Sequence, residues 1–256
     1  MALSDAQTDR LFDSILIKLE NKLGRQILGN FRQLTKSIRA IVESGGEFAG
    51  NTVILENQRE LQLILQDAYF EAIREGAKFT YKETGQEEPD EDDLSALLLL
   101  LIGWVTVTSI QHAQFLTDTT IDIFNTSYQN ALEAGEMGLD IAKMVSRDMQ
   151  KRNKARVKVI GTSEANMAFQ TGSLEAGKTL SDQVLKRWNS QQDRRVRPTH
   201  VSANSRYRKK PIPLGALFSV GAGQGLRPLD PMLPSEETVA CRCYLRMVMP
   251  KNIPIT

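Results

Sequence analysis

The 256-residue sequence is poor in the residues that chemistry most often requires, with two cysteines and two histidines. Cys241 and Cys243 cannot build a disulfide framework, so we expect assembly inside a cell rather than secretion. Residues 1–10 carry acids and no apolar segment, which predicts that there is no signal peptide. Carboxylates paired at metal-ligand spacing and a complete phosphate-binding loop are also absent from the sequence. These absences disfavour most classes of enzyme.

The sequence also has almost no net charge, +1 at pH 7, but this value conceals two opposite halves. Residues 1–145 contain 12 Lys and Arg against 23 Asp and Glu, which gives a net charge of −11. Residues 146–256 contain 20 basic and 8 acidic residues, which gives a net charge of +12. This asymmetry indicates that the two halves face different partners, and it disfavours a metabolic enzyme with a uniform surface.

Long apolar runs are scarce, and the candidate membrane span is residues 94–110. Ser, Thr and Gly interrupt this stretch, and the acidic residues 87–93 precede it. We therefore interpret it as a buried core helix and expect no membrane partner. With 41% hydrophobic and 25% charged residues, the composition is that of a globular protein with one large domain or two small ones.

The acidic half is predicted to consist of helices. In residues 4–42, apolar residues recur every three or four positions, which is the spacing of one long amphipathic helix. Ser4 and Gln7 form a capping-box pattern at its start. A similar stripe predicts another helix over residues 55–82, and either this helix or another subunit would cover the first stripe.

A third helix is predicted from Asp93, a suitable N-cap, to residues 134–135, after an acidic connector at 83–93. His112 lies within it, and a lone histidine on an apolar helix is typical of a packing residue rather than a ligand. The acidic half therefore offers no arrangement of residues that indicates catalysis.

The basic half begins with a predicted helix in which residues 147–158 hold six cations and one acid. Residues 186–210 hold nine cations, the aromatic residues Trp188 and Tyr207, and the single acid Asp193. This composition favours contact with nucleic acid, because cations neutralise phosphates and rings stack on bases. A solvated surface, or a surface for an acidic protein, would have the same composition. No sequence-reading motif is present, so binding would be non-specific. The candidate DNA contacts are Lys151, Arg152, Lys154, Lys186, Arg187, Arg194, Arg206, Arg208, Lys209 and Lys210.

After Pro198, proline and glycine become frequent, which predicts loops and short strands. Residues 216–220 and 244–248 are the expected strands, and the glycine-rich run 221–225 is the expected hairpin loop. The sequence thus predicts an α+β fold that is predominantly α, in which long N-terminal helices precede a small α+β domain with short antiparallel strands and long loops. The predicted domains are an acidic helical region for docking, residues 1–135, and a basic domain, residues 136–256.

The Cys241-Arg242-Cys243 motif has the clearest chemical potential. Residues i and i+2 of a strand point to one face, so the two sulfur atoms would lie side by side. With His200 they make a candidate zinc site, for which Asp193 would be the fourth ligand. Cysteine also serves as a small apolar core residue, so both interpretations stay open. A nucleophilic Cys–His pair has less support, because nothing in the sequence indicates an activating environment.

Several motifs of the basic half, taken together, resemble a known family. They are the helical segment IGTSEANMA at 160–168, the run from Trp188 to His200, Gly215, Pro228, Asp230, the PSEE sequence at 234–237 and the Cys-Arg-Cys motif. The pattern resembles the C-terminal domain of phage Mu F-like minor head proteins, the head morphogenesis proteins of tailed bacteriophages, over about residues 140–246. Thr162 stands where the family has arginine, and Ala240 where it has asparagine. The retained motif residues are Glu164, Trp188, Asp193, Arg195, Arg197, His200, Cys241 and Cys243.

The resemblance implies a minor virion component rather than an enzyme, assembled in the host cytoplasm and located inside the head near the portal. The implied partners are the portal protein, other virion proteins and packaged double-stranded DNA. The implied role is to assist head assembly and DNA packaging or ejection. One alternative is a phage enzyme delivered with the genome, with ADP-ribosyl transfer or nuclease activity that uses Arg195, Glu164 or His200. Another alternative, a host DNA-binding regulator, lacks a groove-reading motif.

The retained residues also have expected structural roles. Asp193 is expected to pair with Arg195 or Arg197 and so to fix the turn before His200. Trp188 is expected in the core of the small domain rather than as a stacking platform for bases. His200 and the two cysteines are expected to join the loops to a strand, with or without zinc.

Overall fold

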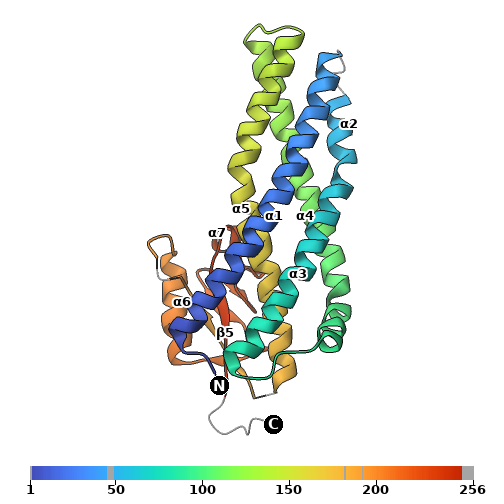
Figure 1. The fold of residues 1–256 in the computed structure, drawn as a ribbon. Helices are drawn as coiled ribbons and strands as arrows, with labels where there is room; N and C mark the ends of the chain where they lie inside the picture. The colour runs from blue at the N-terminus through green and yellow to red at the C-terminus, as the bar shows by residue number, and fades with distance from the viewer. Residues whose placement is uncertain (1, 45–48, 182, 192, 250–256) are drawn as a thin grey trace. The chain divides into compact units, whose positions relative to one another are not determined.

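The computed structural model describes residues 2–44, 49–181, 183–191 and 193–249. The long elements come first: α1 (Asp5–Glu43), α2 (Ala49–Glu56), α3 (Gln58–Thr84), α4 (Glu91–Glu133) and α5 (Leu139–Leu180). Short elements follow: β1 (Leu185–Asn189), α6 (Pro198–Lys209), β2 (Ile212–Pro213), β3 (Phe218–Val220), β4 (Gly223–Gly225), α7 (Ser235–Thr238) and β5 (Tyr244–Val248). Figure 1 shows their order along the chain, and a helical content of 72% confirms the predicted fold class.

The first helix forms as its apolar spacing predicts. Phe12, Leu23 and Ile27 lie on the buried stripe of α1 and are at most 1% exposed. At its start, Ser4 N–H donates to Gln7 Oε1 at 3.0 Å and Gln7 N–H donates to Ser4 Oγ at 3.4 Å, so the capping box is confirmed. The helix predicted over residues 55–82 is instead divided between α2 and α3.

Helix α4 differs from its prediction at its start and on its surface. Asp90, not Asp93, is the N-cap, because Asp90 Oδ1 accepts hydrogen bonds from the N–H groups of Asp92 and Asp93, both at 2.9 Å. The interpretation of residues 94–110 as a buried core helix is wrong. Only 22% of the apolar 18-residue window that makes α4 a candidate membrane span is buried. By length and composition alone, α4 is also apolar enough to cross a membrane.

The exposed large apolar side chains in residues 99–115 of α4 form a set that we call the α4 apolar face. Their exposed fractions range from 44% for Ile110 to 70% for Leu100. Since successive residues of a helix are about 100° apart, these side chains cover a broad sector of α4. The face consists of Leu99, Leu100, Ile102, Val107, Ile110 and Phe115.

The chain divides into two compact units that are interleaved along the sequence. Unit 1 comprises Met1–Glu20, Ala68–Ile102 and Gly161–Thr256, and unit 2 comprises Asn21–Asp67 and Gly103–Ile160. The predicted boundary between residues 135 and 136 differs from this division, because α1, α3, α4 and α5 each contribute to both units. A charge count along the chain cannot reveal such interleaving.

One cluster in the interior of unit 1 brings together aromatic rings from distant parts of the chain. Phe12 of α1 stacks on Tyr244 of β5, with 4.1 Å between the ring centroids. Phe79 of α3 lies 5.3 Å from Phe169 of α5, and Phe12 lies 5.4 Å from Phe169. Such aromatic pairs contribute packing energy beyond the area they bury. The N-terminal residues therefore form part of the core on which the C-terminal strand packs.

Unit 1 also contains two small antiparallel sheets. Strand β1 lies between β2 and β5 in one sheet, and β3 pairs with β4 in the other. The strands predicted at 216–220 and 244–248 are confirmed as β3 and β5, although they belong to different sheets. Of the glycine run predicted as a hairpin loop at 221–225, residues 221–222 form the turn, where Gly221 has a φ of +56°, and residues 223–225 form strand β4. The sequence does not predict strand β1. Buried and partly exposed residues alternate along it, but Lys186 and Arg187 interrupt the apolar pattern that would indicate a strand.

Unit 2 is helical and has its own apolar core. Phe124 of α4 and Met149 of α5 belong to this cluster, together with Leu34, Ile38, Val42, Ile54, Ala131, Ile141, Ala142 and Val145. Arg156 reaches into the same unit, where its guanidinium donates to the Leu116 carbonyl at 2.9 Å and lies 4.9 Å from the centre of the Phe31 ring. Burial lowers the pKa of Arg156 to about 10.

Candidate functional site

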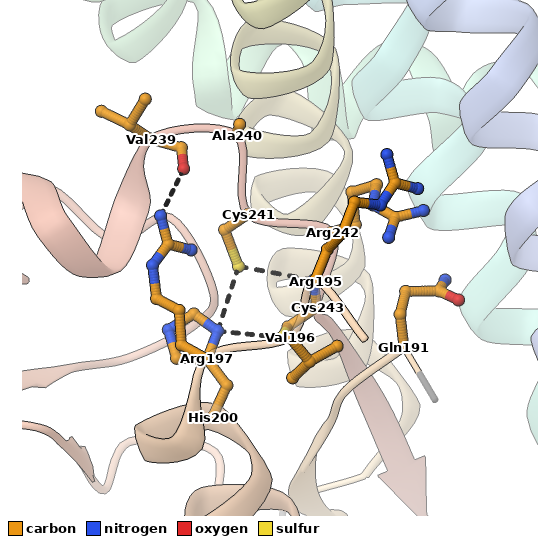
Figure 2. Close-up of a pocket in the computed structure, with 10 residues that line it drawn as sticks. All are labelled: Gln191, Arg195, Val196, Arg197, His200, Val239, Ala240, Cys241, Arg242 and Cys243. Carbon is orange, nitrogen blue, oxygen red and sulfur yellow. Dashed lines mark hydrogen bonds between the residues drawn. The ribbon is translucent and has the colours of Figure 1, made fainter. Parts of the chain in front are cut away.

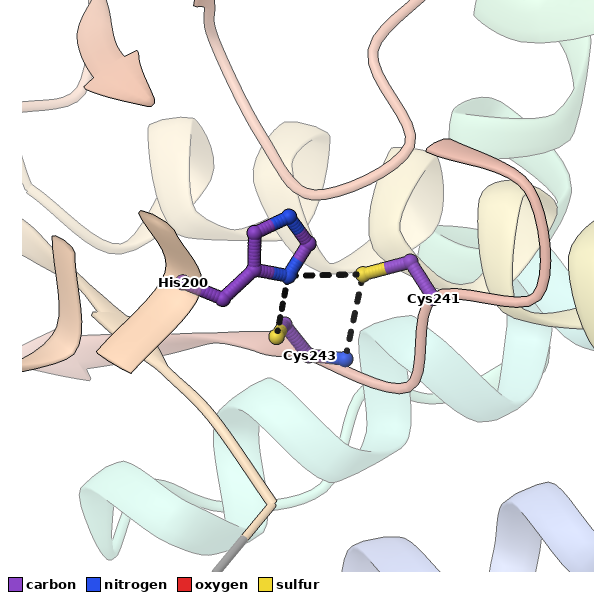
Figure 3. Close-up of side chains that lie close together, drawn as sticks. All are labelled: His200, Cys241 and Cys243. Carbon is purple, nitrogen blue, oxygen red and sulfur yellow. Dashed lines mark hydrogen bonds between the residues drawn. The ribbon is translucent and has the colours of Figure 1, made fainter. Parts of the chain in front are cut away.

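The candidate site is a buried cluster of one histidine and two cysteines in unit 1 (Figure 3). His200 lies in the first turn of α6, and Cys241 and Cys243 lie just before β5. His200 Nδ1 is 3.1 Å from Cys243 Sγ and 3.6 Å from Cys241 Sγ. The three ligand atoms all lie within 4.8 Å of one another, and each residue is at most 2% exposed. The predicted convergence of these three residues is therefore confirmed.

A carboxylate fixes the orientation of the His200 ring. His200 Nε2 lies 2.9 Å from Glu237 Oε2, and Thr199 Oγ1 donates to the same oxygen at 2.8 Å. Trp188 packs edge-on against the imidazole with 5.2 Å between centroids. With its proton on Nε2, next to this carboxylate, the ring would present the lone pair of Nδ1 to the two sulfur atoms.

Helix α5 holds the two cysteines in place through its polar side chains. Asn166 Nδ2 donates to the carbonyl oxygens of Cys241 and Cys243, both at 3.0 Å. Ser163 Oγ accepts a hydrogen bond from the N–H of Ala240 at 2.9 Å. Ala240 has a φ of +53°, a conformation that asparagine adopts more readily than alanine, which accounts for the family preference for asparagine there.

The two sulfur atoms differ in their affinity for a proton. The hydrogen bond with Cys243 and the adjacent His200 hold the pKa of the Cys241 thiol below its ordinary value, against the effect of burial. Burial raises the pKa of the Cys243 thiol well above its ordinary value. The cluster thus places one readily ionised sulfur beside an oriented imidazole.

A cavity of about 280 Å³ opens onto this cluster (Figure 2). Besides the three cluster residues, Arg195, Arg197 and Arg242 line the cavity, together with Gln191, Val196, Val239 and Ala240. Arg197 donates to the carbonyl oxygen of Val239 at 2.6 Å. The cavity therefore combines soft sulfur ligands with a cationic rim.

Asp193 organises this rim but does not join the cluster. It pairs with Arg195, at 3.3 Å between Arg195 Nη2 and Asp193 Oδ2, and also with Arg242. The predicted pairing with Arg195 is confirmed, whereas Arg197 binds the Val239 carbonyl instead. The prediction of Asp193 as a fourth metal ligand is wrong, because this exposed carboxylate is engaged by arginines.

The other retained motif residues have structural positions. Trp188 is fully buried, as predicted for a core residue, and it packs edge-on against Phe218 with 5.6 Å between centroids. Glu164 Oε2 accepts a hydrogen bond from the Tyr69 hydroxyl at 2.5 Å. Asn166 and Glu237 were not assigned roles from the sequence, although both lie in the motif segments. Their places in the motif segments 160–168 and 234–237 are the available signal.

The candidate DNA contacts divide by exposure. Lys186 is wrong as a candidate, because its side chain is fully buried in β1 and its Nζ donates to the Leu226 carbonyl at 2.6 Å. Arg187 is largely covered and pairs with Asp5 at 2.8 Å. Arg208 pairs with Asp5 at 3.0 Å and Arg152 with Asp148 at 2.8 Å, although both remain exposed. The remaining exposed candidates are Lys151, Lys154, Arg194, Arg206, Lys209 and Lys210.

Three acids of α1, spaced four residues apart, bind alternate residues in strand β1 and just after it. Arg187 donates to Asp5 at 2.8 Å, Asn189 to Asp9 at 3.1 Å and Gln191 to Asp13 at 2.5 Å. Four residues of a helix advance about 6 Å and two residues of a strand about 6.6 Å, so the two spacings match. Part of the opposite charge in the two halves is therefore satisfied within unit 1.

The protein is thus predominantly helical, with a small α+β region built around a Cys–His cluster. Residues 122–246 match the family described as Phage Mu protein F like protein, which confirms the resemblance found in the sequence. This part of the chain is similar to that family, which suggests a phage head morphogenesis protein and a location in the virion. Other virion proteins are its implied partners. No curated protein and no solved structure matches the chain.

Proposed function

We propose that the protein is a minor head protein that docks on the portal through the α4 apolar face and contacts packaged DNA non-specifically through exposed cations. In this role it assists head assembly and DNA packaging or ejection from inside the head. The observation that carries the proposal is the α4 apolar face in a chain that is similar to the Phage Mu F-like family over residues 122–246. Large side chains that remain in water mark surfaces that another molecule covers.

The composition of α4 favours a protein over a lipid bilayer as the molecule that covers this face. A spanning helix needs about 20 predominantly apolar residues. Thr106 and Gln111 lie on exposed positions among the apolar residues of α4, and Asp118 follows one turn beyond Gln114. Polar side chains within a membrane-spanning segment are expensive to place in hydrocarbon. At the rim of a protein interface they are readily accommodated.

Polar substitution of the α4 apolar face is expected to abolish docking. In the variant Leu99→Gln, Leu100→Gln and Phe115→Gln, the three most exposed side chains of the face lose their apolar character. Each anchor of an interface contributes about 1–2 kcal/mol or more, so the triple variant should bind at least about 100-fold more weakly. The measurement is co-purification of the full-length protein with its cognate portal protein after co-expression.

A control variant uses exposed apolar residues of other helices. Ile17→Gln, Leu63→Gln and Val201→Gln change side chains that are 49–56% exposed on α1, α3 and α6. This control should co-purify with the portal like the wild type. Equal retention of the two variants would contradict docking through α4, and binding of the wild type to lipid vesicles but not to the portal would assign the face to a membrane.

The DNA contact rests on cations that lack an acidic partner in the described structure. Arg206, Lys209 and Lys210 lie on exposed positions at the end of α6 and its C-cap. The acids that neutralise other cations of unit 1, such as Asp5 and Glu83, bind Arg187, Arg208 and Arg246 instead. Cations held at a surface bind phosphates with a gain from counterion release.

Removing these three cations is expected to reduce the salt dependence of DNA binding. Each phosphate contact contributes about 0.9 to the slope of log K against log salt concentration. The variant Arg206→Ala, Lys209→Ala and Lys210→Ala should therefore lower the slope by about two to three, equally for unrelated duplexes. The measurement is a salt titration of binding by the full-length protein.

The control variant removes the same charge from the helices. Lys18→Ala, Arg25→Ala and Lys82→Ala change exposed cations of α1 and α3 and should leave the slope unchanged. Binding that does not weaken from low to physiological salt would refute the DNA contact. An equal loss in both variants would show that net charge, rather than the end of α6, controls binding.

A further inference from the structure

We propose that His200, Cys241 and Cys243 form a zinc site whose fourth position opens into the arginine-lined cavity. The three donors are a neutral imidazole nitrogen and two sulfur atoms, which is a ligand set suited to zinc. This inference concerns unit 1 alone and does not depend on portal docking.

The distances between the donors fit tetrahedral coordination. Zn–N and Zn–S bonds of about 2.0 and 2.3 Å at tetrahedral angles separate nitrogen and sulfur by about 3.6 Å. His200 Nδ1 lies 3.6 Å from Cys241 Sγ and 3.1 Å from Cys243 Sγ. A shift of the Cys243 side chain by about half an ångström would bring the second nitrogen–sulfur distance to the tetrahedral value.

The surroundings of His200 distinguish a ligand from a packed residue. Zinc-bound histidines generally donate their second N–H to a carboxylate, which fixes the tautomer and the direction of the ring. Glu237 occupies this place at 2.9 Å from Nε2, and Thr199 holds Glu237 at 2.8 Å. Simple packing of two small cysteines would not require a buried carboxylate on the far side of the imidazole.

The cysteines are also held independently of any metal. Asn166 binds both cysteine carbonyl groups, and Gln170 Nε2 donates to Asn166 Oδ1 at 2.7 Å. Gln170 Oε1 in turn accepts the N–H of Leu245, the second residue of β5, at 2.8 Å. This network positions the two sulfur atoms before a metal arrives, which reduces the entropic cost of binding.

The fourth position is open and attracts anions. His200, Cys241 and Cys243 contribute to the wall of the cavity, and Arg195, Arg197 and Arg242 line the same space (Figure 2). In the isolated protein a water molecule would complete the coordination, as at other zinc sites with three protein ligands. The arginines select an anionic group, such as a carboxylate, as its replacement.

The test uses full-length protein purified under reducing conditions, loaded with Zn²⁺ and passed over a desalting column. Elemental analysis should find about one zinc per chain, and the Co²⁺-substituted protein should show sulfur-to-cobalt charge-transfer bands with tetrahedral d–d bands. Azide should shift the cobalt bands by entering the open position. Retention of no zinc, or an octahedral cobalt spectrum without charge transfer, would overturn the site. Cobalt bands that do not respond to azide would overturn its open position.

A substitution outside the ligands keeps the test independent of folding. Glu237→Gln retains all three ligands and should weaken zinc binding by about 10–100-fold in competition with a chelator. Glu236→Gln changes the exposed neighbour of Glu237 in α7 and should leave the affinity unchanged. Equal affinities of the two variants would remove the assigned role of Glu237 in holding the ligand.

Discussion

Replacement of Gly172 by alanine is expected to destabilise unit 1 by about 3 kcal/mol. A Cβ atom at Gly172 of α5 would lie 2.2 Å from the carbonyl oxygen of Ile73 in α3, and one at Gly76 would lie 2.1 Å from the carbonyl oxygen of Phe169. The clash is with backbone, so no rotamer change relieves it, and the two helices must separate. Separation would also break the hydrogen bond that Ser173 Oγ donates to the Gly76 carbonyl at 3.1 Å.

The stability of unit 1 can be measured through a single tryptophan. In a Trp104→Phe background, the fluorescence of the buried Trp188 follows denaturant unfolding of unit 1. Gly215→Ala is the control, because Gly215 also belongs to unit 1 and a Cβ there meets nothing within 4 Å, so the stability of unit 1 should not fall. A Gly172→Ala protein as stable as its parent would contradict the close contact of α3 and α5.

The pH dependence of stability is expected to change when Lys186 is replaced by methionine. Burial lowers the pKa of Lys186 to about 7; Asp230 raises it, whereas Lys178 and Arg227 lower it further. The unfolded chain, with an ordinary lysine pKa of about 10.4, binds more protons than the folded protein between pH 7 and 10. The stability of the wild type should therefore rise with pH in this window, by about 2 kcal/mol from pH 7 to 9.

Lys186→Met should lose this rise. The Lys186 ammonium lies 4.9 Å from the centre of the Phe218 ring, and its proton binds the Leu226 carbonyl, so methionine fits the apolar surroundings but leaves that carbonyl unpaired. Absolute stability is thus a poor criterion, and the difference in slope between the two proteins is the measurement. Parallel curves between pH 7 and 9 would show that Lys186 stays charged in the fold. DNA binding should be unchanged, since the residue is buried.

Periodicity allowed prediction of the long helices but not of their partners. The stripe of α1 and its capping box follow from residue spacing alone, because both depend on local geometry. The Leu-rich stretch of α4 was misassigned to the core, since composition shows that a helix is apolar but not whether the same chain covers it. The interleaving of the two units depends on contacts between residues far apart in sequence, such as Phe12 with Tyr244.

The sequence predicts the three candidate ligands but not the residues that hold them in place. The i, i+2 spacing of Cys241 and Cys243 and the family motif placed both near His200, and the structure brings them together. The roles of Asn166 and Glu237 require the path of the chain between α5, α6 and α7, which local patterns do not specify. Lys186 was assigned to the surface for the same reason, because a cation in a basic run gives no sign that its strand is central.

The structure gives a second explanation for the opposite net charges of the two halves of the sequence. Asp5, Asp9 and Asp13 of α1 bind alternate residues from Arg187 to Gln191, and Glu83 lies 2.7 Å from Arg246. These pairs assign some acids of the first half to internal contacts rather than to a partner. The exposed cations at the end of α6 and the α4 apolar face then remain as the surfaces that the proposed function uses.

Docking through the α4 apolar face is measured by the amount of full-length protein that elutes with its cognate portal protein. We expect stable co-elution of the wild type, retention of the Ile17, Leu63 and Val201 control variant, and loss of the Leu99, Leu100 and Phe115 variant. Absence of the wild type from the portal fraction, with both proteins folded and soluble, would contradict it.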